Sequence, residues 1–253
     1  MAQLSAEVRN LSTLSPVERD ALGEELFALH RKIFSGLSRW QFVDYVLHDH
    51  AAPTKIKIFR NAEETAVGYC AVHGYQRRWR GKSCTIFRAE AGLLKQFRGR
   101  QETASFIFMQ GLSYKLQNPT RRVFYLGMLV HPSSYCLIAE RFPTIYPSRR
   151  RKTPQHIQEA MGELADSFEV PQAEGNLLLR EIGWITRETA AEADAWRSSK
   201  HPDVRFFLAM NPRYERGTGL VTLVPFTIRN LLGAAANQFM LMLTTSRRRW
   251  RTG

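Results

Sequence analysis

The hydrophobic pattern of this chain changes period near its middle, and that change constrains the fold more than any other feature. Residues 55–59 alternate polar and apolar side chains, and 66–75 and 83–94 follow as short segments separated by turns. These segments predict antiparallel strands joined by hairpins. Residues 103–116 then place apolar side chains at helical spacing, and 123–130 is a continuous apolar run. The order strand, helix, strand predicts a crossover into a buried strand that pairs in parallel.

Elements on both sides of this segment complete an α/β pattern. Ser15, Pro16 and Glu18 form a helix-start signature, with serine as N-cap and glutamate three residues later. We expect one further helix that begins at Ser38, another that ends at Phe142, and two more over 154–168 and 188–196. We also expect a strand over 177–185, a closing hairpin over 204–210 and 220–224, and a final helix from Thr227. The sequence therefore predicts one α/β domain over 1–253, with a mixed, mostly antiparallel central sheet flanked by helices.

The charge balance of the chain is unusual. Lys and Arg number 36 against 23 Asp and Glu, which gives a net charge of +13 and an isoelectric point near 10.1. Such an excess favours polyanionic partners, although widely spread arginines are also typical of a plain solvated surface. The 15 Phe, 8 Tyr and 5 Trp exclude a disordered chain.

Signals for disulfides, zinc and export are weak. Cys70, Cys84 and Cys136 have neither the number nor the spacing of a disulfide framework or a zinc site, so we expect no metal. The first residues lack the basic and apolar stretches of a secretory signal, which favours a cytoplasmic protein. Residues 220–245 are apolar, but Pro225 and several polar residues interrupt them. We expect a strand and a partly buried helix there, with peripheral membrane contact as the alternative.

Residues 93–103 carry the most specific local pattern. They read Leu93-Leu94-Lys95-Gln96-Phe97-Arg98-Gly99-Arg100-Gln101-Glu102-Thr103. The segment resembles the pyrophosphate loop of the GNAT acyltransferases, in which an aromatic residue precedes Arg-Gly-x-Gly-x-Gly or Ala. The order of elements over 15–142 is similar as well. Gln101 and Thr103 stand where that family has glycine and glycine or alanine. In such a loop, backbone N–H groups at a helix N-terminus hold the pyrophosphate.

The resemblance implies a thioester donor and the residues that bind it. The donor would be acyl-CoA or an acyl carrier protein, and the basic surface suits an acidic carrier. The implied donor-binding residues are Leu93, Leu94, Arg98, Gly99, Arg100, Gln101 and Thr103. The implied division of the chain is a core over 15–142, an inserted region over 143–203, a closing hairpin over 204–226, and a C-terminal helix with a basic tail over 227–253.

The same resemblance implies two catalytic residues. In the family, a carboxylate near the fourth strand serves as general base for the amine, and Glu90 has that position. A tyrosine on a later helix protonates the leaving thiolate, and Tyr135 is the match, with Tyr146 as the alternative. A buried carboxylate with a raised pKa would suit the base. From the residues alone, Glu90 could instead face solvent or pair with Arg88 or Lys95, and Tyr135 could be a packing residue with a hydrogen-bonded hydroxyl.

Histidines near the ends of predicted elements were weighed as catalytic or metal-binding groups. His131 follows the buried strand and precedes Ser133 and Ser134. A nucleophile–base pair is one interpretation, but no Gly-x-Ser-x-Gly elbow surrounds the serines, so a strand-capping histidine is favoured. His73 is interpreted as structural. The segment His48-Asp49-His50 is interpreted as a solvated helix end, because residues two apart on a helix do not converge on one ion.

Three functions follow as hypotheses. The favoured one is an N-acyltransferase that moves an acyl group from the thioester to an amine, with a Leu93 or Leu94 N–H directed into an open cleft beside Val130. The first alternative is a non-catalytic GNAT-like scaffold that binds nucleic acid or protein, with steeply salt-dependent binding and no wide cleft. The second is a peripheral membrane acyltransferase acting on a lipid-like amine through the helix from Thr227 and its Arg-Trp-Arg end.

Overall fold

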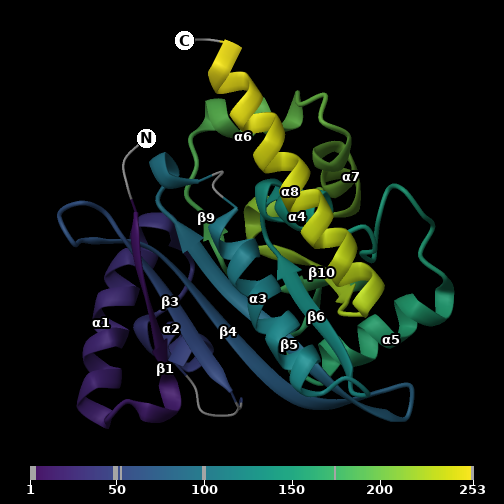
Figure 1. Cartoon of the computed structure of the whole chain (residues 1–253), viewed down its shortest axis with the longest axis horizontal. Coiled ribbons are helices and arrows are strands. Elements are labelled where there is room, and N and C mark those ends of the chain that lie inside the picture. The colour runs from purple at the N-terminus through teal and green to yellow at the C-terminus, as the bar shows by residue number, and fades with distance from the viewer. Residues whose placement is uncertain (1–3, 48–50, 52, 99–100, 174, 252–253) are drawn as a thin grey trace.

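The computed structural model describes residues 4–47, 51, 53–98, 101–173 and 175–251, with side chains as far as Met240. Its centre is an eight-stranded sheet (Figure 1). In spatial order the strands are β1 (Ser5–Asn10), β3 (Thr54–Arg60), β4 (Ala66–Trp79), β5 (Lys82–Leu93), β6 (Arg122–Leu129), β10 (Thr218–Pro225), β8 (Asn176–Glu181) and β7 (Gln172–Ala173). Only β5 and β6 pair in parallel, and the other neighbours are antiparallel. The predicted mixed, mostly antiparallel sheet is therefore confirmed.

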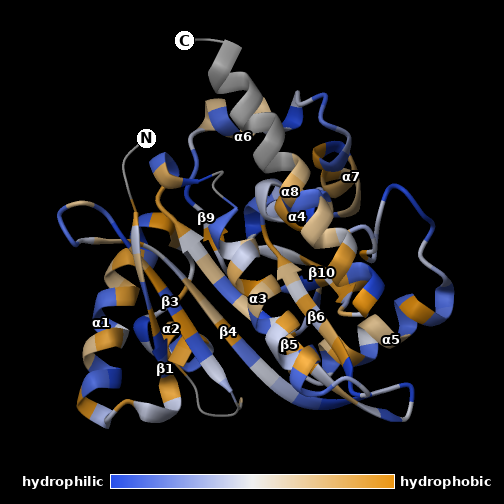
Figure 2. Cartoon of the chain, viewed as in Figure 1, coloured by the Kyte–Doolittle hydropathy of each residue, from blue (hydrophilic) through white to orange (hydrophobic). Residues whose placement is uncertain are grey.

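Helices flank the sheet on both sides. They are α1 (Pro16–Ile33), α2 (Arg39–Leu47), α3 (Glu102–Gln117), α4 (Pro132–Arg141), α5 (Gln155–Asp166), α6 (Ala190–Arg197), α7 (Pro202–Met210) and α8 (Ile228–Arg251), with 3-10 turns η1 (Leu11–Thr13), η2 (Lys95–Phe97) and η3 (Tyr214–Arg216). In Figure 2, the apolar segments gather where helices meet the sheet. One apolar cluster joins α1 and α2 to the sheet, and another joins α3, α4 and the start of α8 to it.

Local signals fix the first half of the chain. The Ser15 hydroxyl accepts a hydrogen bond from the Glu18 N–H, and the Glu18 carboxylate accepts one from the Ser15 N–H at 2.8 Å. This is the predicted capping box. Leu22, Leu26 and Leu29 then face the sheet as buried residues. The long β4–β5 hairpin turns through Arg80 and Gly81, which both have positive φ, as a tight two-residue turn requires.

The predicted closing hairpin is wrong in its first half. Residues 204–210 lie in α7, with Pro202 at the first helical position and Val204 and Phe207 buried one turn apart. The run Val-Arg-Phe-Phe-Leu-Ala-Met is short and apolar, and such a run does not distinguish a strand from a buried helix by its period. Consequently β10 pairs with β6 on one side and with β8 on the other.

The region 143–203 is integrated into the fold. Its strand β8 belongs to the central sheet. Its short strand β9 (Ile185–Thr186) pairs antiparallel with β2 (Phe34–Ser35), directly after α1. This second, two-stranded sheet brings residues 182–188 back over the end of β5, where the candidate site lies.

The C-terminal helix α8 runs along α4 and extends past the body of the molecule (Figure 1). Leu231 and Ala234 bury their side chains, whereas Leu232 and Phe239 are exposed. Within the described residues, we find no helix with both the length and the apolar character to cross a bilayer.

Candidate functional site

The central sheet opens between β5 and β6. The two strands pair only where Cys84–Phe87 meets Arg122–Tyr125. Beyond Phe87 the two described strands no longer pair, although β5 continues to Leu93 and β6 to Leu129. Because β6 stays paired with β10 over this stretch, the split leaves one edge of β5 without a strand beside it.

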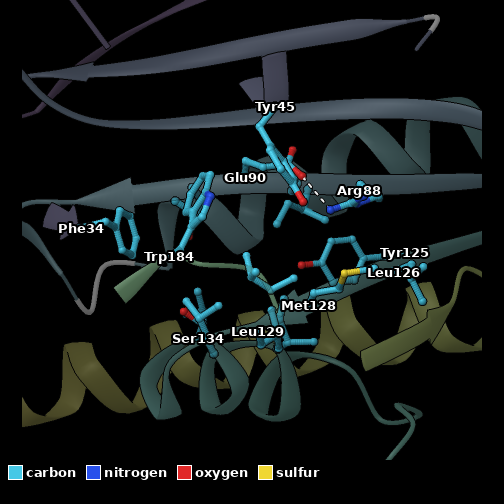
Figure 3. A pocket seen from close by; sticks show the side chains of 18 residues that line it. Phe34, Tyr45, Arg88, Glu90, Tyr125, Leu126, Met128, Leu129, Ser134 and Trp184 are labelled. Atoms are coloured by element: carbon cyan, nitrogen blue, oxygen red, sulfur yellow. Dashed lines mark ion pairs between the residues drawn. The ribbon is translucent and has the colours of Figure 1, made fainter. Parts of the chain in front are cut away.

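The first hollow at the split is the Glu90 cavity, with a volume of about 110 Å³. Figure 3 shows Glu90, Arg88 and Tyr45 on one side of it, Phe34 and Trp184 at one end, and Ser134 and Leu129 on the other side. Its remaining lining residues are Ala89, Ala91, Thr103, Ile107, Tyr125, Leu126, Met128, Val130, Leu137, Ile138 and Ile182. The cavity is therefore mostly apolar, with its charges concentrated on β5.

The second hollow is the Arg98 cavity, with a volume of about 170 Å³. It is lined by Ile33, Phe34, Ala91, Gly92, Leu93, Arg98, Gln101, Glu102, Thr103, His131, Ser133, Ser134, Leu137 and Thr186. Ala91, Thr103 and Ser134 line both hollows, as do Phe34 and Leu137. The two cavities are thus adjacent, with β5, α3 and α4 forming their common wall.

Glu90 lies at the centre of a buried polar cluster. Its Oε2 is 3.0 Å from His73 Nε2, and its Oε1 is 3.4 Å from the Arg88 guanidinium. The other ring nitrogen of His73 is 3.0 Å from the Thr54 hydroxyl. Burial by itself raises the pKa of Glu90, but His73 and Arg88 lower it by more, so its pKa lies below the ordinary value. The raised pKa that would suit a general base is not found, because β4 and β5 place His73 and Arg88 beside the carboxylate.

The Arg88 guanidinium packs against two aromatic rings. Its guanidinium carbon is 4.7 Å from the centroid of the Phe168 ring and 5.9 Å from that of Tyr45. Cations pack favourably over aromatic faces at such distances. The strand–strand register places Arg88 opposite His73, so the cation, the imidazole and Glu90 share one face of the sheet.

Two aromatic side chains come to the Glu90 cavity from distant segments. Trp184 precedes β9, and its ring contacts Phe34 at 5.2 Å and His30 at 4.7 Å between centroids. Phe34 crosses β5 at Gly92, where an added Cβ would be only 2.8 Å from the Phe34 ring. Gly92 is therefore the place where β5 lacks a side chain so that Phe34 can reach both cavities.

The backbone of β5 supplies N–H donors to the split. The Leu94 N–H donates to the Val67 carbonyl at 2.9 Å, so of the two predicted donors, Leu93 and Leu94, Leu94 does not point into the cleft. Successive N–H groups of a strand point to opposite edges, so those of Leu93 and Ala91 face the open side. Both residues line the Arg98 cavity, and Ala91 also lines the Glu90 cavity, which Val130 borders.

The implied phosphate site lies at the start of α3. Arg98 lines the Arg98 cavity and its Nε donates to the Leu93 carbonyl at 3.0 Å. Gln101 adopts a left-handed conformation (φ 59°) and makes no side-chain cap bond to α3. Its buried Oε1 has no hydrogen-bond partner in the described part of the chain. Gly99 and Arg100 lie outside the described residues. The backbone at Gln101 is thus of the kind that a glycine would favour.

A second glutamate–histidine pair borders the Arg98 cavity. His131 caps the N-terminus of α4, accepting hydrogen bonds on Nδ1 from the Ser133 N–H at 3.2 Å and the Ser133 hydroxyl at 2.7 Å. Its Nε2 is 3.3 Å from the Glu188 carboxylate, which also accepts a bond from the Tyr214 hydroxyl at 3.0 Å. These bonds hold the pKa of Glu188 below its ordinary value, although burial opposes them. His131 therefore caps a helix rather than a strand.

Tyr135 lies away from both cavities. It is fully buried, its hydroxyl donates to the Pro147 carbonyl at 3.1 Å, and its ring packs against Phe206 and Phe207. Burial raises its pKa. Tyr146, the alternative, is absent from the lining of both cavities as well. The hydroxyls of α4 that do reach the site belong to Ser133 and Ser134, so the structure does not bring the predicted tyrosine to Glu90.

Several site residues were missed in the sequence. His73 was interpreted as structural, and Tyr45, Phe34 and Trp184 were not singled out as site residues. Arg88 was weighed only as a partner that would neutralise Glu90. An alternation signal was available for Arg88 and Glu90, which lie two apart on a strand and so share a face. No local signal connects them to Trp184, which is nearly a hundred residues later.

Within the described residues there is no group of His, Cys, Asp and Glu side chains that could hold a metal ion. His48-Asp49-His50, interpreted above as a solvated helix end, lies outside the described residues.

Comparisons with known proteins identify partial likenesses only. No family model matches the sequence, and no curated protein matches it. Similar solved structures include the Escherichia coli GNAT family N-acetyltransferase YhbS in complex with CoA (15% identity over 54% of this chain and 68% of that chain, TM-score 0.35). Others are Arabidopsis thaliana NAA60 in complex with acetyl-CoA (14%, 55% and 84%, TM-score 0.37) and an acyl-CoA N-acyltransferase from Pseudomonas aeruginosa (12%, 50% and 80%, TM-score 0.32). Because these TM-scores are below 0.5, the likenesses do not establish what this chain does.

Proposed function

We propose that this protein is an N-acyltransferase that uses acyl-CoA to acylate an amine. One observation carries the proposal: the split between β5 and β6 joins a cavity with a buried carboxylate to a cavity with phosphate-binding features. Ala91 lines both cavities, and its backbone N–H points to the open edge of β5. An acyl thioester lying across Ala91 would have its carbonyl beside that donor and its leaving group in the Arg98 cavity.

The Arg98 cavity suits the donor. The N-terminus of α3 offers first-turn N–H groups beside the cavity, and the helix dipole favours negative charge there. Arg98 adds a cation on the same wall. The carboxylate of Glu102, also in the first turn, is 3.3 Å from Lys57, which offsets its repulsion of a phosphate. These features favour free acyl-CoA as the donor.

The Glu90 cavity suits the amine. Glu90 is ionised, lines the cavity and can take a proton from an incoming ammonium. The neutral amine attacks the thioester carbon, the C–N bond forms and the C–S bond breaks. The Ala91 N–H stabilises the oxyanion in between. Of the two protons that the ammonium loses, one passes to solvent through Glu90 and the other ends on the CoA sulfur.

The leaving thiolate forms beside α4 in this arrangement. Ser134 lines both cavities, and its hydroxyl can donate to the sulfur as charge develops. The N-terminal dipole of α4 stabilises the same charge. Tyr135, bonded to Pro147, takes no part. A cavity of about 110 Å³ must hold both the acyl group and the reacting amine, so a short acyl group is expected.

The lowered pKa of Glu90 makes a definite prediction about pH. A carboxylate that is already ionised contributes no inflection to the rate near neutrality. The rate should therefore rise with pH as the acceptor ammonium deprotonates. The alternative scaffold hypothesis has no use for a carboxylate-lined cavity joined to a cationic one. The membrane hypothesis is supported by exposed apolar side chains of α8, such as Leu232 and Phe239, and not by the cavities.

The testing experiment measures binding and transfer together. Purified protein is titrated with acetyl-CoA and longer acyl-CoA species while thermal stability is followed, and CoA release is then measured with a mixture of primary amines. We expect stabilisation by acetyl-CoA and amine-dependent CoA release. A Glu90→Gln variant should still bind acetyl-CoA but transfer poorly. Absence of stabilisation by every acyl-CoA species would contradict the proposal.

A further inference from the structure

The Glu90 cavity contains two opposite charges side by side. Arg88 and Glu90 lie two residues apart on one face of β5, and each is only 8% exposed. Both line the cavity, as Figure 3 shows. Their ion pair is long, with 3.4 Å between the guanidinium nitrogen and Oε1. Among the described residues, Glu90 is the only acidic side chain within ion-pairing distance of Arg88.

Each of the two charges is supported by protein on its far side. Glu90 Oε2 faces His73 at 3.0 Å, and the Arg88 guanidinium rests on Phe168. These contacts fix the positions of the two groups but use only part of their hydrogen-bonding capacity, because a guanidinium has five N–H donors and a carboxylate accepts about four hydrogen bonds. Glu90 Oε2 also has no well-directed hydrogen bond among the described residues. Capacity for a polar ligand therefore remains on both groups.

This pairing selects the charge of the acceptor. An amine that carried only an ammonium would approach Glu90 but would meet the Arg88 cation in the same small cavity. A molecule that carried only a carboxylate would meet Glu90. A molecule with both groups on adjacent carbons matches each charge with its opposite, and such complementarity discriminates against the singly charged analogues.

We propose that the acceptor is a zwitterionic α-amino acid, whose carboxylate is bound by Arg88 and whose ammonium is placed against Glu90. The inference rests on the proposed acyl transfer and adds the class of substrate to it. The guanidinium is suited to the carboxylate because its planar fork can donate two parallel hydrogen bonds. Placed in this way, the amine lies against Glu90, and the next residue of β5, Ala91, also lines the cavity.

The walls of the cavity specify the side chain of this amino acid. Phe34 and Trp184 lie at one end, Leu129 lies on the side opposite the charged pair (Figure 3), and Leu126, Ile138 and Ile182 are further apolar lining residues. No further charged side chain lines the cavity among the described residues. A charged side chain would lose its hydration there without gaining a partner. The amino acid is therefore expected to have a small or medium-sized apolar side chain.

Binding without any donor provides the test. Calorimetry or ligand-observed NMR compares two matched series: leucine with 3-methylbutylamine and 4-methylpentanoate, and alanine with ethylamine and propionate. In each series the second compound lacks the carboxylate and the third lacks the amine. We expect at least one of the amino acids to bind, and its singly charged analogues to bind about ten-fold or more weakly, as loss of a hydrogen bond to a charged group implies.

Variants of Arg88 test whether this residue binds the carboxylate of the amino acid. Arg88→Gln should weaken binding of the amino acid by about ten- to a hundred-fold and remove its advantage over the matched amine. Arg88→Lys keeps the charge without the fork and should lie between. Arg78→Gln is the matched control, since Arg78 is an exposed arginine on the neighbouring strand β4, and it should leave binding unchanged. Circular dichroism and thermal unfolding of each variant establish that it is folded.

The outcomes separate this inference from the proposed function. If the amines bind as tightly as the amino acids, or if no compound of either series binds, the zwitterion inference is overturned. If 3-methylbutylamine is acylated as fast as leucine, acyl transfer stands and the inference falls. If leucine or alanine binds through Arg88 but no acyl-CoA species yields an acylated product, the amino-acid site stands and the proposed transfer falls.

Discussion

The Glu90 cavity and the Arg98 cavity hold their polar groups in different ways. In the first, charged side chains project from adjacent strands, and the register of β4 and β5 sets their spacing. In the second, the principal donors are backbone groups at the N-termini of α3 and α4, with one arginine added. Strand-borne side chains can distinguish small differences in the position of charge, whereas helix ends accept any compact anion. In the proposed function, the Glu90 cavity would therefore determine which acceptor binds, and the Arg98 cavity would hold the donor.

Removing the Glu90 charge should separate the two sides most clearly. Glu90→Gln keeps the shape and removes the base, so kcat should fall by about 10² to 10⁴, the usual contribution of general acid–base catalysis. The affinity for acetyl-CoA should remain as it was. Steady-state kinetics and donor titration check both statements, with the exposed Glu63→Gln as control. Equal loss of donor binding would mean that the two cavities are not functionally distinct.

Arg98→Gln tests the other side. The KM for acyl-CoA should rise by about ten- to a hundred-fold, because a charged hydrogen bond to phosphate is lost. The KM for the acceptor should change little, since Arg98 does not line the Glu90 cavity. Arg80→Gln, an exposed arginine in the β4–β5 turn, is the matched control. A rise in the acceptor KM alone would reverse the assignment of the two sides.

Gly92 joins the comparison because Phe34 borders both cavities across it. An added side chain would meet the Phe34 ring at 2.8 Å and Ile33 at 3.1 Å, so Gly92→Val should destabilise the protein by about 1–3 kcal/mol through overpacking. Chemical denaturation measures this. In a double-mutant cycle, Gly92→Ala with Phe34→Leu should cost less than the sum of the single changes. Strict additivity would show that the ring is not the obstacle.

The charged cluster of the Glu90 cavity should also appear in the pH dependence of stability. The pKa of Glu90 is lower in the folded protein than in the unfolded chain, where it is about 4.3. Its ionised form therefore stabilises the fold above that value, and the contribution is lost as pH falls through the lower folded-state pKa. The difference in Tm between wild type and Glu90→Gln should be constant from pH 7 to about 5 and should narrow below about 4. A difference that widened with acid would contradict the lowered pKa.

The smallest effect is expected at Gln101. Its left-handed backbone is a conformation that glycine adopts without strain, so Gln101→Gly should change stability by no more than about 1 kcal/mol. Removal of the side chain opens the Arg98 cavity, and acetyl-CoA should bind a few-fold more tightly. Thermal unfolding and donor titration decide this. Weaker donor binding would indicate that the unpartnered Gln101 amide oxygen itself contacts the donor.

Local interactions explain what could be predicted from the sequence. The Ser15–Glu18 capping box, the β4–β5 hairpin and the crossover through α3 each depend on residues close together in the chain. Each of these features can therefore be predicted from residues that are close together in the sequence. Glu90 was implied by the resemblance to the GNAT acyltransferases, through its place on a strand that precedes a glycine-containing loop.

Tertiary structure alone decided the rest of the site. Whether Leu93 or Leu94 directs its N–H into the split depends on the register with β4, and a shift of one residue exchanges them. The pKa of Glu90 falls rather than rises because His73 and Arg88 face it and outweigh the effect of burial. Residues 204–210 form a helix because that is how their apolar side chains reach the core. Trp184 reaches Phe34 only through the pairing of β9 with β2. The sequence by itself determined the order of most elements, since short-range spacing encodes it. Which charges and rings meet in the cavity was decided by long-range packing, because residues 45, 73, 88 and 184 become neighbours only when the sheet is assembled.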